Sequence, residues 1–76
     1  MSRKYQVEHF GTGGEFIESH RVTASNVKSA IHQIHDDACE ANGWIWEPRD
    51  GSYFNPKTMH EVRALPAVEV DSYNNV

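Results

Sequence analysis

The sequence has little of several features that would identify a function directly. It contains one cysteine in 76 residues, Cys39, which excludes an internal disulfide and gives no sign of an oxidising compartment. No apolar run approaches the roughly 18 residues of a membrane span, and the opening segment "MSRKYQVEHF" lacks the apolar stretch of a signal peptide. We therefore expect a soluble, cytoplasmic protein that does not associate with membranes.

Positive charge is also scarce, with 7 Lys+Arg against 11 Asp+Glu. Proteins that bind nucleic acid usually display a basic patch, which displaces counterions from the phosphates. Nucleic acid is therefore a disfavoured partner, unless folding gathers the scattered basic residues on one side: Arg3, Lys4, Arg21, Lys57 and Arg63. The net charge of −4 is compatible with a positively charged partner.

The chain is long enough for one domain only. At 76 residues it buries about 60–65% of the surface that its unfolded form exposes, so a deep substrate cleft is hard to build. This favours a binding surface over an enzyme. We predict a single domain over residues 1–66 and a flexible C-terminal tail over 67–76, where the sequence ends in "VDSYNNV".

Two strands and a tight turn are predicted at the start. "KYQVEHF" (4–10) alternates as a half-buried strand does, and "EFIESHRVTA" (15–24) returns antiparallel after the turn "GTGG". The adjacent apolar residues Phe16 and Ile17 indicate a bulge or a two-sided strand. A Gly-rich loop can also bind phosphate, but that use requires a helix directly after it, and a strand follows here.

A helix is predicted from Ser25 to Asn42. Ser25 is a suitable N-cap, and Asn42–Gly43 is a suitable end because glycine accepts the left-handed conformation past a helix C-terminus. Apolar residues between them recur at spacings of three and four: Val27, Ala30, Ile31, Ile34, Ala38 and Ala41.

The sequence of the second half of the chain indicates further β-strands. "GWIWEPRDGSYF" (43–54) is typical of a β-hairpin with an Asp-Gly turn, "NPKT" is a second turn, and "HEVRAL" (60–65) is a candidate last strand. Asn55 and Pro56 could instead begin a helix, but we favour the strand because the hairpin needs more sheet to pair with. The predicted fold is α+β, a ββαββ two-layer sandwich whose antiparallel sheet has one helix on one face. The other face is then polar, paired with another copy, or used for binding.

Polar residues on the predicted helix form a second stripe. His32, His35, Asp36 and Cys39 stand at i, i+3, i+4 and i+7, which suggests metal ligands at first sight. One helix offers only two good ligands, however, and the sequence has no second cluster, only the scattered His9, His20 and His60. A thiolate at Cys39 is disfavoured by the helix dipole. We therefore predict no metal, cofactor or catalytic residue, and a stripe that faces solvent or a partner.

The two tryptophans alternate with Ile45, so both indoles point to one face of a strand. They lie either in the core beneath the helix or, with Tyr53, on the open face as an aromatic interface. The alternation does not distinguish these two sides. The predicted partner-binding residues are Trp44, Trp46, Tyr53, His32, His35 and Asp36.

The segment "VTASNVKSAIHQIHDDACEANGWIWEPRDGSYFNPKT" runs strand, capped helix, glycine, aromatic strand and Asp-Gly turn. In order and length it resembles small accessory proteins of phages and mobile elements, including the anti-CRISPR inhibitors. The resemblance covers about half of the chain and implies a non-enzymatic protein that binds a host protein and blocks its working surface. An inhibitor of a host nucleic-acid-processing or defence complex is thus the predicted function, with a homodimer as one arrangement. The alternative is a small nucleic-acid-binding or regulatory domain that uses the sheet face.

Overall fold

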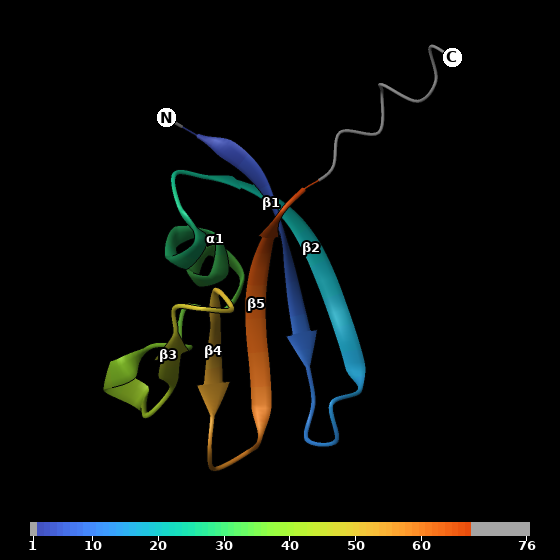
Figure 1. Cartoon of the computed structure of the whole chain (residues 1–76), viewed down its shortest axis with the longest axis vertical. Coiled ribbons are helices and arrows are strands. Elements are labelled where there is room, and N and C mark those ends of the chain that lie inside the picture. Colours follow the sequence, from blue (N-terminus) through green and yellow to red (C-terminus); the bar gives the residue numbers. More distant parts are fainter. Residues whose placement is uncertain (1, 68–76) are drawn as a thin grey trace.

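The computed structural model describes residues 2–67 and shows a small α+β domain (Figure 1). The elements follow in the order β1 (Arg3–Phe10), β2 (Phe16–Ala24), α1 (Val27–Ile34), the 3-10 helix η1 (Glu40–Asn42), β3 (Ile45–Glu47), β4 (Ser52–Asn55) and β5 (His60–Pro66). The predicted α+β class is confirmed. The predicted ββαββ order is wrong, because three strands follow the helix instead of two. No helix within the described range is long and apolar enough to cross a membrane.

All five strands form one antiparallel sheet in the order β2-β1-β5-β4-β3. Strands β1 and β5, at the two ends of the described part of the chain, are therefore neighbours at the centre of the sheet, as Figure 1 shows. Helix α1 packs against β1, β2 and β5, so it covers one face of the sheet. We call the opposite face the uncovered face.

The β1–β2 turn is a hairpin, as predicted. The Gly14 N–H donates to the carbonyl of Gly11 at 2.9 Å, and Gly14 adopts a φ of +83°, which side-chain-bearing residues rarely accept. The register shifts by one residue between His9 and Phe10, so Phe10 pairs with Phe16 and the chain bulges at Ile17. The adjacent pair of apolar residues thus marks a bulge.

Helix α1 is shorter than predicted, and its cap is a different residue. Asn26, not Ser25, is the N-cap: its side-chain oxygen accepts from the Ser29 N–H at 2.8 Å. The helix ends at Ile34, and the chain turns at Asp36 and Asp37, which prefer turns to helix interiors. The segment after the turn still brings Ala38 into the core, which explains why the apolar spacing continued past the true helix end.

The core lies between α1 and the face of the sheet that it covers. Alanines at points of close approach let the helix lie near the strands, and larger side chains fill the remaining space. The buried apolar residues are Tyr5, Val7, Ala24, Ala30, Ile31, Ala38, Tyr53, Val62 and Ala64.

The segment after β4 is a turn and a strand, which confirms the favoured prediction over the helix alternative. The Asn55 side chain accepts hydrogen bonds from the N–H groups of Lys57 (2.9 Å) and Thr58 (3.2 Å), which folds the chain back into β5. Of the predicted tail, Ala67 donates its N–H to the carbonyl of Lys4 at 3.0 Å. Residues 68–76 lie outside the described part of the chain.

Candidate functional site

The predicted aromatic interface lies largely on the covered side of the sheet. Tyr53 is 1% exposed and sits in the core, because β-strand alternation points it under the helix. The Trp46 ring lies 4.9 Å from the Tyr53 ring, and both Trp44 and Trp46 are half-buried against the core. Ile45, between them, points the other way and is 48% exposed.

The predicted polar stripe does not exist as a single helix face, because α1 ends before three of its four members, His35, Asp36 and Cys39. His32 donates from Nε2 to the carbonyl of Ala38 at 3.0 Å, which ties the helix to the turn that follows it. His35 turns towards His9, with ring centroids 4.8 Å apart, whereas Asp36 is exposed. The three predicted contact residues therefore have three different surroundings.

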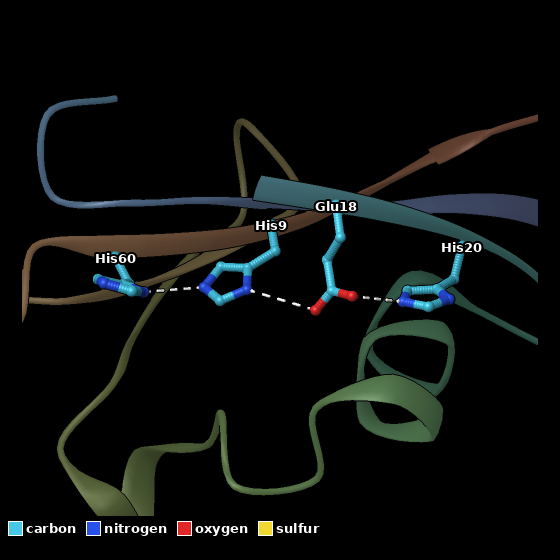
Figure 2. Close-up of polar contacts among 4 residues, drawn as sticks. All are labelled: His9, Glu18, His20 and His60. Carbon is cyan, nitrogen blue, oxygen red and sulfur yellow. Dashed lines mark hydrogen bonds and ion pairs between the residues drawn. The ribbon is translucent and has the colours of Figure 1, made fainter. Parts of the chain in front are cut away.

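A group of histidines that are far apart in the sequence meets on the covered side, beyond the apolar core. His9 follows Tyr5 and Val7 in the alternation of β1, so it points to the same side as they do. Antiparallel pairing places Glu18 directly opposite His9. We call His9, Glu18, His20, His35 and His60 the His–Glu cluster; Figure 2 shows four of them in a row across β5, β1 and β2.

The contacts in the His–Glu cluster form a chain. His20 donates from Nε2 to Glu18 Oε1 at 2.9 Å, and His9 Nε2 lies 2.9 Å from His60 Nδ1, so one of these two imidazoles donates to the other (Figure 2). His9 Nδ1 is 3.8 Å from Glu18 Oε2, beyond hydrogen-bond range. His9 Nδ1 and His35 Nε2 are buried atoms without a hydrogen-bond partner among the described residues.

The cluster lowers the pKa of two of its members, Glu18 and His35. The hydrogen bond from His20 is the largest cause that lowers the pKa of Glu18. Burial lowers the pKa of His35, and the neighbouring His9 lowers it further. In residues 2–67, one group of three possible metal ligands has all of its ligand atoms within 4.8 Å of one another, namely His9, Glu18 and His35.

The uncovered face carries a line of side chains that crosses all five strands and is apolar on four of them. Residues that pair across neighbouring strands share a face, and one line of pairs joins Ile45, Phe54, Glu61, Phe10 and Phe16. We call its apolar members, Ile45, Phe54, Phe10 and Phe16, the apolar row. Phe16 is 57% exposed and its ring makes an edge contact with that of Phe10, 6.0 Å between centroids.

Charged side chains accompany the apolar row. Glu61 lies within it by register, and the next line of pairs holds Glu47, Arg63 and Glu8. The Arg63 guanidinium lies 4.6 Å from the centre of the Phe10 ring, and its Nε donates to Glu8 at 3.2 Å. Sequence analysis missed this row because it depends on register, although the position of Ile45 opposite the two tryptophans was a signal for it.

The basic residues are divided between the two faces and the two ends of the sheet. Lys4 and Arg21 line a shallow hollow of about 200 Å³ near the start of β1, together with Val22 and Thr23. Lys57 lies in the β4–β5 turn, at the opposite end of the sheet in Figure 1. By register, Lys4, Arg21 and Arg63 belong to the uncovered face, where Arg63 is paired with Glu8, and Arg3 belongs to the covered face. Three of the five basic residues therefore share the uncovered face, and the nucleic-acid alternative stays a prediction.

Comparison of this chain with protein-family models, with curated proteins and with solved structures gives no significant match.

Proposed function

We propose that this protein is a non-enzymatic binding protein that attaches to a partner protein through the uncovered face of its sheet. The observation that carries the proposal is the apolar row, which includes the exposed side chains of Phe16 and Ile45 on the face that α1 does not cover. Large apolar side chains that are aligned and accessible usually mark a contact surface, since their burial against a partner is favourable.

The partner that fits is a protein surface with apolar side chains at its centre and basic residues around them. Glu61 lies within the apolar row and Glu47 beside it, while the nearby Arg63 is neutralised by its pairing with Glu8. The whole chain carries a net charge of −4. Complementary charge raises the rate of association and selects among partners.

In its specific form, the proposal is a phage-type, anti-CRISPR-like inhibitor in the host cytoplasm. Such a protein would cover the basic nucleic-acid-binding surface of a host defence or processing complex. Three observations support this form: the acidic balance of the chain, its small size, and the order of elements in residues 22–58, which resembles such inhibitors. The experiments below also detect two other partners, a second copy of this chain and a nucleic acid, and either of them would contradict this form of the proposal.

Affinity capture with matched variants tests the proposal. The double variant Phe16→Ser/Ile45→Ser removes two exposed members of the apolar row, and Met59→Ser is the control because Met59 is equally exposed but lies in the β4–β5 turn. The proposal is supported if a captured protein binds directly to purified wild type and to Met59→Ser but does not bind to the double variant. The double variant must keep the melting temperature of wild type, which shows that it is folded. Equal binding by all three proteins contradicts it.

Two further measurements separate the other outcomes. Sedimentation of wild type and of the double variant detects a dimer through the same face, since only wild type would then dimerise. Binding of a fluorescent single-stranded oligonucleotide at low salt, lost steeply as salt is added, would identify a nucleic-acid-binding domain instead. We expect a monomer without oligonucleotide binding.

A further inference from the structure

We propose that His9, Glu18 and His35 bind a divalent transition-metal ion, with zinc as the best match to their chemistry. The ligands come from three parts of the fold: β1, β2 and the turn after α1. They lie on the covered side of the sheet, so this site is separate from the apolar row and its existence does not depend on the proposed function.

The distances between the three side chains suit a tetrahedral ion. Zinc bonds of about 2.0–2.2 Å to nitrogen and oxygen place neighbouring ligand atoms about 3.4 Å apart. His9 Nδ1 and Glu18 Oε2 are 3.8 Å apart, which is too far for a hydrogen bond and a few tenths of an ångström from the separation that zinc requires. All three ligand atoms lie within 4.8 Å of one another, so small rotations of the side chains would bring them together.

The atoms that would bind the ion are those that have no other partner. His9 Nδ1 and His35 Nε2 are both buried and lack a hydrogen bond within the described structure. A buried polar atom without a partner is unfavourable, and native structures rarely keep two of them side by side without a reason. A metal ion between them accepts both lone pairs, which provides such a reason.

Two neighbouring histidines orient the ligands. When His9 donates from Nε2 to His60 Nδ1, over the observed 2.9 Å, His9 Nδ1 is left with the lone pair that a metal needs. His20 donates to Glu18 Oε1 at 2.9 Å, which leaves Oε2 towards His9. Outer partners of this kind are usual around metal ligands, since they fix the tautomer of a histidine or the rotation of a carboxylate.

The donor set selects the class of ion. Two imidazole nitrogens and one carboxylate oxygen favour zinc and similar transition metals over magnesium and calcium, which prefer oxygen ligands only. Three protein ligands also leave one tetrahedral position for water. The sulfur of Cys39 is not part of the set of three, although cysteine is a strong zinc ligand.

The experiment uses the tag-free chain, freed of metal with a chelator and titrated with zinc chloride by calorimetry. We expect one zinc per chain and no saturable binding of magnesium. Glu18→Gln and His35→Asn should each weaken zinc binding by more than about 100-fold, since each removes a ligand. Asp36→Asn and Cys39→Ser are the controls: Asp36 is exposed beside His35, and Cys39 is the chain's one thiol, so neither change should alter the affinity.

Variants at His20 test whether its hydrogen bond to Glu18 orients that ligand, without removing a ligand of the ion. His20→Leu removes the donor to Glu18 and should weaken zinc binding roughly 10-fold, whereas His20→Gln keeps an N–H donor and should restore much of it. Equal affinities of these two variants would contradict the orienting role of His20.

X-ray absorption spectroscopy at the zinc edge identifies the ligands in the wild-type protein, so it tests the proposal even if a ligand variant fails to fold. Nitrogen and oxygen neighbours at about 2.0 Å, with imidazole scattering and no sulfur, support the site. The proposal is overturned by sulfur in the zinc shell, by the absence of stoichiometric zinc binding, or by unchanged binding in folded Glu18→Gln and His35→Asn.

Discussion

The hydroxyl of Tyr53 donates a hydrogen bond of 2.9 Å to Glu40 Oε1, which ties β4 to η1 beneath the helix. Lys28 on α1 lies 3.4 Å from the other oxygen of the same carboxylate. One exposed glutamate thus connects three elements, and the buried tyrosine gains a partner for its hydroxyl.

This contact predicts a loss of stability in alkali. Burial, and then the hydrogen bond to Glu40, raises the pKa of Tyr53 above its ordinary value of 10.0. A group whose pKa is raised by folding contributes its stability in full below the unfolded pKa and loses it as the pH rises through the folded pKa. The free energy of unfolding, measured with urea at a series of pH values, should therefore fall above about pH 10.

The variant Tyr53→Phe should remove part of that alkaline decline. It should also cost about 1 kcal/mol at neutral pH, where it loses the hydrogen bond but keeps the ring. Glu40→Gln should behave in between, because its amide oxygen still accepts from Tyr53 without the negative charge. An alkaline decline as steep in Tyr53→Phe as in wild type would show that Tyr53 is not its cause.

The N-cap of α1 gives a sharp comparison between neighbouring residues. Asn26→Ala should lower the free energy of unfolding by about 1 kcal/mol, because the Ser29 N–H loses its acceptor. Ser25→Ala should change it by less than about 0.5 kcal/mol, since Ser25 is exposed and does not cap the helix. Urea unfolding measures both, and a larger loss in Ser25→Ala would restore Ser25 as the cap.

Adjacent residues of β3 should differ in the same assay. Trp46→Ala should cost about 2 kcal/mol, because its half-buried ring packs against Tyr53 and beneath Lys28. Ile45→Ala should cost less than about 1 kcal/mol, since Ile45 points to the uncovered face. The reverse order of the two losses would place the tryptophan on the surface.

Gly43 should be sensitive to substitution without any clash. Its φ of +88° is in the left-handed region, and an added Cβ would meet no atom within 4 Å. Gly43→Ala should therefore cost about 1 kcal/mol through backbone strain alone, and Gly43→Asn should cost less because asparagine tolerates this conformation. Equal stability of all three proteins in thermal unfolding would contradict this account.

Local patterns predicted the elements better than their ends. The spacing of Val27, Ala30, Ile31 and Ile34 correctly indicated α1, but the same spacing continued through Ala38 after the helix had stopped. Periodicity reports which residues are buried, and a turn can bury a residue as well as a helix can. Gly43 was correctly identified as a left-handed end, although it ends η1 and not α1.

The His–Glu cluster was beyond sequence analysis for a different reason. His9, Glu18 and His20 could have been matched across the "GTGG" hairpin if its register had been known, but the bulge at Ile17 shifts that register. His35 enters the cluster only because α1 ends early, and His60 only because β5 lies beside β1. These are properties of tertiary structure, so the histidines appear scattered in the sequence.

The adjacency of β1 and β5 has a consequence for synthesis on the ribosome. Val7 pairs with Ala64, so the centre of the sheet joins residues 57 positions apart and cannot form until β5 has left the exit tunnel. Until then, this part of the sheet consists of the β1–β2 hairpin alone, and an isolated two-stranded hairpin is marginally stable in water. The emerging chain therefore leaves one edge of β1 unpaired until β5 arrives, and chaperones have that interval in which to bind it.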